Sequence, residues 1–184
     1  MFLFNGIGLR LVEKRDLEKI RTLRNSQSTW IWLTDVKQIN EIQQLQWYES
    51  ICQDKSVEYY SIVENKKDFP IEYEGEFLGI IRVNNIDLVN KSAMIGLDIE
   101  PNFRGQGIGT KAFLAVMEYF FRHRNFHRLW LCVIEDNEVA KKLYNNVGFK
   151  EEGILRQAIW REGKFKDYIV MSILEFEYRG KDAL

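Results

Sequence analysis

Residues 95–110 of the chain read IGLDIEPNFRGQGIGT, and a strongly apolar run follows them. Apolar side chains alternate with other residues over 95–99, which is the spacing of a β-strand. Pro101 and Asn102 then stop the strand. The apolar run over 107–122 predicts a long helix, so this stretch is expected to form a strand, a short loop and a helix.

Three glycines, at positions 105, 107 and 109, lie between the predicted strand and the helix. Glycine lets the backbone turn tightly and lets another molecule approach it closely. The start of a helix presents unpaired N–H groups and the positive end of the helix dipole, so the loop is a candidate site for an anion such as pyrophosphate. The glycine spacing is not G-x-G-x-x-G, and the Gly-Lys-Ser/Thr ending of a P-loop is absent.

The composition is typical of one globular domain. The chain has 184 residues, of which 46% are hydrophobic and 14% aromatic, enough for one buried core. A net charge of −1 gives no reason to expect a nucleic-acid partner. The two cysteines, Cys52 and Cys132, do not suggest a disulfide framework or a metal site. The two histidines, His123 and His127, do not complete a metal-ligand pattern. Without a signal-peptide pattern or a membrane-spanning run, we expect a cytoplasmic protein with no membrane or metal partner.

The first half of the chain is expected to alternate strands and helices. A loop is predicted over 25–35, and its Trp30 and Trp32 either line a pocket mouth or pin the loop to the core. A helix is predicted over 40–54, with an apolar stripe that places Cys52 among the buried residues: Ile42, Leu45, Tyr48, Ile51 and Cys52. The other predictions are a helix after Asp16, surface or turn segments over 64–70, 72–76 and 84–87, and strands over 8–12, 58–63, 77–83 and 91–100.

After the glycine loop, residues 128–134 form a continuous apolar run that is typical of a central strand covered on both faces, with Cys132 in the core. A short helix over 138–145 follows Asp136 and Asn137 as caps and ends before Gly148. The remaining predictions are a turn at 162–163, a frayed polar tail at 177–184, and strands over 149–160 and 165–176.

Several motifs in this order resemble the GNAT superfamily of N-acetyltransferases. They are Arg104-x-x-Gly107-x-Gly109, then Asn137-x-x-Ala140, then Leu143-Tyr144 with Gly148-Phe149. The segment 152–156 and the hairpin after it are similar to the branch that holds ribosomal-protein N-terminal, polyamine and nucleotide-amino-sugar acetyltransferases. The match covers 77–176, so the resemblance implies one acetyltransferase domain over 1–184. Within it, 1–76 would form the acceptor half, 77–176 the acetyl-CoA-binding core and 177–184 a tail.

The resemblance implies an α/β (α+β) fold: a mixed, mostly antiparallel sheet that splays between two parallel strands, with helices on both faces. Acetyl-CoA, the expected cosubstrate, would lie in that split. The backbone of Leu97, Asp98 and Ile99 would hold its pantetheine and acetyl group, and Asn137 and Tyr144 would contact it. Its pyrophosphate would be cradled by N–H groups from Arg104, Gly105, Gln106, Gly107, Ile108, Gly109 and Thr110.

The expected chemistry is the attack of a neutral amine on a thioester, which requires a proton acceptor for the amine and a proton donor for the departing thiolate. Tyr144 is the candidate donor, and a core tyrosine is its alternative reading. Relatives often carry a Glu where this chain has Met94, so we name Asp98 as the candidate acceptor of the proton. Asp98 is equally well explained as a solvated or paired carboxylate, and Glu135 is a second candidate base.

The acceptor is the least constrained part of the prediction. Arg24, Asn25, Trp30, Ile39 and the segment 46–48 resemble amino-sugar acetyltransferases, so a small amine such as a nucleotide-linked amino sugar is the leading acceptor. Alternatives are a protein N-terminus, a non-catalytic acyl-CoA-binding module, or a polyamine held by carboxylates such as Glu41, Glu49, Asp54 and Glu58. A homodimer is also expected.

Overall fold

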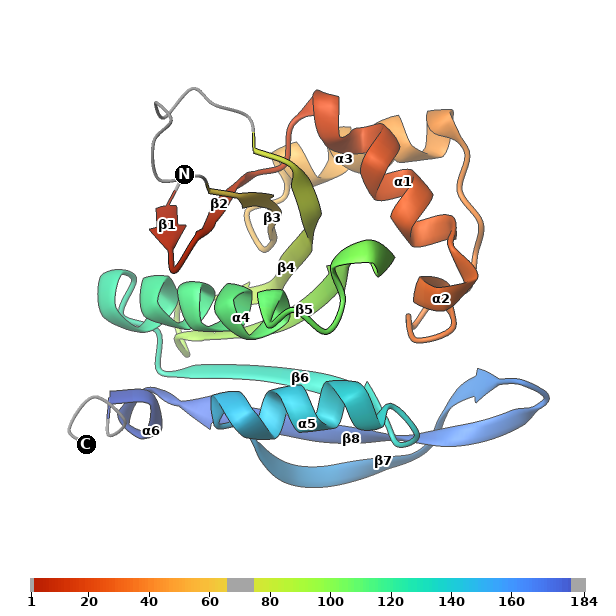
Figure 1. Cartoon of the computed structure of the whole chain (residues 1–184). Helices are drawn as coiled ribbons and strands as arrows, with labels where there is room; N and C mark the ends of the chain where they lie inside the picture. Colours follow the sequence, from red (N-terminus) through yellow and green to blue (C-terminus); the bar gives the residue numbers. More distant parts are fainter. Residues whose placement is uncertain (1, 66–74, 180–184) are drawn as a thin grey trace.

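The computed structural model describes residues 2–65 and 75–179, and it contains one eight-stranded sheet with the order β1-β2-β3-β4-β5-β6-β8-β7 (Figure 1). The predicted excursion at 64–70 and the turn at 72–76 lie largely outside the described residues. The strands are β1 Phe2–Phe4, β2 Ile7–Leu11, β3 Glu58–Glu64, β4 Phe77–Asp87, β5 Ser92–Ile99, β6 Arg128–Ile134, β7 Lys150–Arg161 and β8 Lys164–Leu174.

Neighbouring strands run antiparallel except for β5 and β6. These two pair in parallel over only three positions, from Ser92 opposite Arg128 to Met94 opposite Trp130. Beyond that point each strand continues beside its other neighbour, so β5 and β6 diverge. The mixed, splayed sheet predicted from the sequence is therefore confirmed.

Helices cover both faces of the sheet, as predicted. The main core packs α4 (Ile108–Glu118) and α5 (Glu138–Val147) against one face, and its largest fully buried side chains include Phe113, Phe120 and Phe121. A smaller cluster with Ile20, Leu23 and Ile80 packs α1 (Leu17–Asn25) and α3 (Glu41–Gln53) against the other face. Each face of β4 thus has its own core, because successive strand residues point to opposite sides.

Several predicted boundaries were wrong. The loop over 25–35 contains a short helix, α2 (Gln27–Trp30), and β4 runs through the predicted turn at 84–87. The helix predicted over 107–122 is confirmed, because α4 continues as a wider π-helical turn, Tyr119–His123. A short 3-10 turn, Lys14–Asp16, leads into α1.

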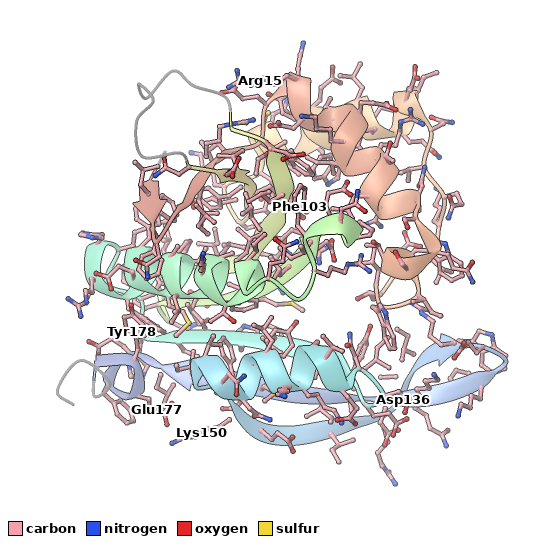
Figure 2. The ribbon with its side chains drawn as sticks, in the orientation of Figure 1. Arg15, Phe103, Asp136, Lys150, Glu177 and Tyr178 are labelled. Atoms are coloured by element: carbon pink, nitrogen blue, oxygen red, sulfur yellow. The ribbon has the colours of Figure 1, made fainter. Side chains whose placement is uncertain are left out.

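The C-terminal segment is more ordered than the predicted frayed tail. It forms α6 (Glu175–Arg179), in which Tyr178 is buried and its hydroxyl donates to Glu118 of α4 at 2.7 Å. Figure 2 shows Lys150 and Glu177 beside each other, and they form an ion pair. The last described turn is therefore fastened both to α4 and to β7.

The apolar stripe predicted on α3 is only partly the buried face of that helix. Ile42 is 69% exposed, and Cys52 is also exposed. Of the predicted stripe, Tyr48 packs inward, and Gln44 and Trp47, which were not predicted, lie on the same side. The orientation of α3 on the sheet therefore follows its aromatic side chains, and not the spacing of its aliphatic residues.

Candidate active site

A cavity of about 1170 Å³ begins where β5 and β6 diverge and passes through the split in the sheet. Residues from both faces of β5 line it: Ile95, Leu97 and Ile99 on one face, and Gly96 and Asp98 on the other. A molecule bound in the split can therefore reach from the face that carries α4 and α5 to the face that carries α1 and α3.

The glycine loop forms one end of this cavity. Gly105 and Gly107 both have φ of 75°, a left-handed conformation that favours glycine, and no described heavy atom lies within 4 Å of a Cβ added at either position. No described side chain caps α4, whose first backbone bond runs from the Lys111 N–H to the Gly107 carbonyl. The helix start therefore offers open N–H groups and the positive end of its dipole, which fits a diphosphate.

Gly109 has a different role from the other two glycines. A Cβ there would lie 3.0 Å from Leu97 and 3.2 Å from Leu143. The missing side chain lets the first turn of α4 pack closely between β5 and α5. This contact holds the N-terminal end of the helix beside the split.

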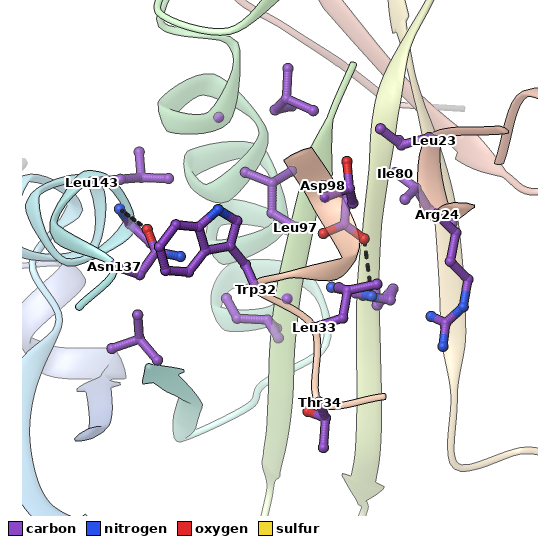
Figure 3. A pocket seen from close by; sticks show the side chains of 18 of the residues that line it. Leu23, Arg24, Trp32, Leu33, Thr34, Ile80, Leu97, Asp98, Asn137 and Leu143 are labelled. Carbon is purple, nitrogen blue, oxygen red and sulfur yellow. Dashed lines mark hydrogen bonds and ion pairs between the residues drawn. The ribbon is translucent and has the colours of Figure 1, made fainter. Parts of the chain in front are cut away.

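Eleven of the twelve residues predicted to bind the cofactor line the cavity, and Gln106 is the exception among them. The Gln106 side chain instead donates to the Asn102 carbonyl at 3.0 Å. Asn137 caps α5 with its side-chain oxygen, which accepts from the Ala140 N–H at 3.1 Å, and Figure 3 shows it with Leu143 across the split from Leu97.

Tyr144 lies on α5, 9% exposed, with its ring against Phe113 at a centroid distance of 5.3 Å. Burial, helped by the nearby carboxylate of Asp98 and opposed by Arg82, raises the pKa of Tyr144 to about 12. The phenol is therefore protonated at neutral pH. Because Tyr144 lies in the cavity wall, its hydroxyl can donate a hydrogen bond to a group bound in the split.

Asp98 is paired with a basic side chain that the sequence analysis missed. The Arg82 guanidinium on β4 lies 3.0 Å from Asp98, and the dashed line that starts at Asp98 in Figure 3 marks this ion pair. Gly96 leaves room for it, because a Cβ there would lie 3.2 Å from the guanidinium. Arg82 lies opposite Gly96, and Ile80 lies opposite Asp98, so the Arg82 and Asp98 side chains lie on the same face of the sheet. Predicting this ion pair from the sequence would require knowledge of the register between β4 and β5.

The cavity continues into a chamber between this face of the sheet and helices α1 and α3. We call it the front chamber and define it by Arg24, Gln44, Trp47, Tyr59 and Arg82, all of which line the cavity. Trp47 and Tyr59 meet edge to face, with ring centroids 5.1 Å apart. The chamber is therefore aromatic and basic, and it lies on the same side of the sheet as Asp98.

A segment from α2 and the loop after it, residues 28–34, crosses between the two halves of the split sheet; we call it the bridging segment. Arg104 holds its first part, donating to the Ser28 carbonyl at 3.1 Å and to the Thr29 hydroxyl at 2.8 Å. Arg161 of β7 holds its second part, donating to the carbonyls of Ile31, at 3.0 Å, and Leu33.

Three other sequence predictions are tested by the lining of the cavity. Glu135 accepts from the Asp167 N–H at 3.0 Å and is not among the described lining residues, so it is a poor candidate base. Cys132 is only partly buried and lines the cavity instead of filling the core. Of the two tryptophans, Trp32 lines the cavity, whereas Trp30 is not among the lining residues that the structure describes.

The carboxylates expected to hold a polyamine do not form a group at the cavity. Glu58 is bound by Arg124 at 2.6 Å and by the hydroxyl of Tyr60. Within the described ranges, none of the four lines the cavity: Glu41, Glu49, Asp54 and Glu58. Over the same ranges, no helix is long and apolar enough to cross a membrane, and no three His, Cys, Asp or Glu side chains form a metal-binding group.

A sheet split between parallel strands, with the open start of a helix at one end and a tyrosine and a carboxylate in the wall of the same cavity, is typical of acyl-CoA-dependent N-acyltransferases. The chain belongs to the acetyltransferase (GNAT) family, whose family model matches residues 18–149, more than half of its length. It is therefore an acetyl-CoA-dependent N-acetyltransferase, as the sequence predicted.

Three relatives illustrate this similarity. The putative ribosomal N-acetyltransferase YdaF of Bacillus subtilis is 30% identical over 95% of this chain and 94% of its own length. Spermidine N(1)-acetyltransferase of Escherichia coli is 26% identical over 95% of this chain and 89% of its own length. A spermidine N-acetyltransferase of Vibrio cholerae, solved with CoA and spermine, superposes with a TM-score of 0.84 at 23% identity, covering 95% of this chain and 98% of that one.

Proposed function

We propose that this chain acetylates a small-molecule primary amine by direct attack on acetyl-CoA, with the amine in the front chamber. The observation that carries the proposal is the continuity of the cavity, which joins the glycine loop, Tyr144, Asp98 and the front chamber. A diphosphate on the N-terminus of α4 would place the rest of the cosubstrate along the open edge of β5. The thioester would then lie at the split, between the two faces of the sheet.

In the proposed reaction, the amine nitrogen forms a bond to the thioester carbonyl carbon, and the carbon–sulfur bond then breaks. Asp98 accepts the proton that the nitrogen loses, directly or through water, and Arg82 fixes the orientation of its carboxylate. Tyr144 donates a proton to the departing thiolate and regains one from solvent. The products are an N-acetyl amide and free CoA, so no oxidant or further reactant is needed.

The relatives' names bear on the acceptor. They include spermidine and ribosomal N-acetyltransferases, which match the polyamine and protein N-terminal alternatives and not the amino sugar predicted from the sequence. The front chamber lies between the sheet and helices α1 and α3, and residues of the bridging segment line the same cavity, which supports a compact acceptor. We therefore keep a small primary amine as the proposed acceptor and a protein N-terminus as the second candidate.

The test is thiol release from acetyl-CoA by the purified chain with a panel of amines, for wild type and Tyr144→Phe. We expect Tyr144→Phe to lower kcat by about 100-fold, because the thiolate loses its donor, with the dissociation constant of acetyl-CoA little changed. Tyr119→Phe is the matched control, since it removes the same hydroxyl from a tyrosine that is not among the described lining residues. Full turnover in Tyr144→Phe would remove the phenol from the reaction.

The pH dependence of kcat gives a second measure of this phenol. Because the pKa of Tyr144 is raised to about 12, the group stays protonated through neutral and moderately alkaline pH. We therefore expect no alkaline decrease in kcat up to about pH 10, where an ordinary tyrosine would titrate. A wild-type decrease centred at about pH 10 that Tyr144→Phe abolished would contradict the buried, protonated state of this side chain.

A further inference from the structure

The front chamber carries more basic than acidic side chains. Arg24 and Arg82 lie in its wall and Lys37 lines the same cavity, against the two carboxylates Asp35 and Asp98. Both carboxylates already face an arginine: Asp98 lies 3.0 Å from Arg82, and Asp35 lies 3.7 Å from Arg24. In the described part of the chain, no unpaired carboxylate is left in this chamber to hold the additional ammonium groups of a polyamine.

Two of the basic groups remain available to a ligand. The ion pair of Arg24 with Asp35 is long, and the Asp35 side chain is 59% exposed, so this pair is weak and easily exchanged for another anion. Lys37 has no ion-pair partner among the described residues. Figure 3 shows Arg24 beside Leu23 and Ile80, on the same side of the sheet as the pair that Asp98 forms.

The remaining wall of the front chamber favours a polar ring over an aliphatic chain. Trp47 and Tyr59 present aromatic surfaces there. Gln44 of α3 is 3% exposed, and neither its amide nitrogen nor its amide oxygen has a hydrogen-bond partner among the described residues. Buried amide groups normally have hydrogen-bond partners. A hydroxyl or carbonyl group of a ligand would supply the missing hydrogen bonds if the Gln44 side chain turned towards it.

We propose that the acceptor is an amine that also carries an anionic group, a phosphate or a carboxylate, which Arg24 and Lys37 bind while the amine lies at Asp98. This inference rests on the proposed function and names the class of its acceptor. It separates this chain from the relatives named for spermidine, whose substrate carries only positive charges at neutral pH. Arg24 is a specificity-determining residue in this reading, because it contacts the acceptor and not the reacting atoms.

The test compares matched acceptors with the whole chain and acetyl-CoA, by thiol release. Glucosamine 1-phosphate and glucosamine differ only in the anionic group, and spermidine supplies the opposite charge. We expect kcat/KM for glucosamine 1-phosphate to exceed that for glucosamine by about 10-fold or more, and that for spermidine by a larger factor. Because the preference is electrostatic, it should shrink as salt is raised from low to high ionic strength.

Two arginine variants on α1 assign the effect to a residue. Arg24→Gln should reduce the phosphate preference to less than about 3-fold, because one charged contact is lost. Arg21→Gln is the matched control, since Arg21 lies on the same helix, pairs with Glu18 and is absent from the described lining of the cavity. An equal loss of preference in both variants would overturn the assignment to Arg24.

The outcomes also separate this inference from the proposed function. Acetylation of spermidine or of a peptide at a kcat/KM equal to or above that of glucosamine 1-phosphate would overturn the anionic acceptor and leave the transferase standing. Equal values for the phosphorylated and neutral sugars would overturn it as well. No thiol release with any amine, despite binding of acetyl-CoA, would overturn both proposals together.

Discussion

The glycine loop and the front chamber are built over very different distances along the chain. At the loop, the first backbone bond of α4 joins Lys111 to Gly107, and the cap of α5 joins Ala140 to Asn137. At the front chamber, the bonds that position the bridging segment run from Arg104 to Thr29 and from Arg161 to Ile31, which are 75 and 130 residues apart. The cosubstrate end is thus a local structure, whereas the acceptor end requires the complete tertiary fold.

One way to separate the two ends is to damage the local end alone. Gly107→Glu forces a side chain into a left-handed conformation and places a carboxylate where the diphosphate is expected. We expect the dissociation constant of acetyl-CoA to rise by about 30-fold or more, equivalent to roughly 2 kcal/mol, from strain and charge repulsion. Calorimetric titration of the purified variant with acetyl-CoA measures it.

Gly163→Glu is the matched control for that variant. Gly163 has φ of +79° in the turn between β7 and β8, and a Cβ there also meets no described atom within 4 Å. The backbone strain is therefore similar, but the residue is not among those that line the cavity. A comparable loss of acetyl-CoA affinity in both variants would show that strain alone explains the result and would argue against an anion site at α4.

The second way is to damage the long-range end alone. Arg161 is 6% exposed, and all three of its described hydrogen bonds go to carbonyl groups: those of Ile31, Leu33 and Trp160. Arg161→Met fills similar space but leaves these carbonyls without a donor. We expect the KM for the acceptor to rise about 10-fold while the dissociation constant of acetyl-CoA stays within about 2-fold, because the bridging segment loses its bonds to Arg161 and keeps only those to Arg104 and Tyr168.

Arg156→Met controls for the loss of a positive charge from β7, since Arg156 lies on the same strand and is exposed. Arg161→Lys tests the geometry, because lysine keeps the charge but cannot match the spread of the three guanidinium bonds. A KM that recovers fully in Arg161→Lys would mean that charge, and not the position of the bridging segment, determines acceptor binding. Thermal unfolding of each variant shows whether the fold itself is retained.

The same contrast explains what the sequence could and could not predict. The strand, the glycine loop and the long helix were predicted because their signals lie within a few residues of each other, at Gly105, Gly107 and Gly109. The pairing of Arg82 with Asp98 was not, because it depends on which residues of β4 and β5 lie opposite each other. On α3, spacing alone favoured Ile42, which is exposed, over the buried Gln44.

Arg104 is the residue at which the two ends of the site meet. The sequence motif assigned it to the cosubstrate, through its backbone, but its guanidinium extends in the other direction, to Ser28 and Thr29 of the bridging segment. A third bond, from its Nε to the Ile99 carbonyl at 3.0 Å, fixes the side chain on the end of β5. We therefore expect a change at the loop on binding acetyl-CoA to affect the acceptor side.

A double-mutant cycle on Arg104→Gln and Thr29→Val measures that link. Thr29 is buried, and its hydroxyl accepts from Arg104 at 2.8 Å, so either change removes the same bond. We expect Thr29→Val to raise the acceptor KM about 5-fold, equivalent to ~1 kcal/mol, and Arg104→Gln to raise it more, because that change also removes the bonds to Ser28 and Ile99. Adding Thr29→Val to Arg104→Gln should raise the KM little further. Strictly additive effects would mean that the bond between Arg104 and Thr29 does not couple the two ends.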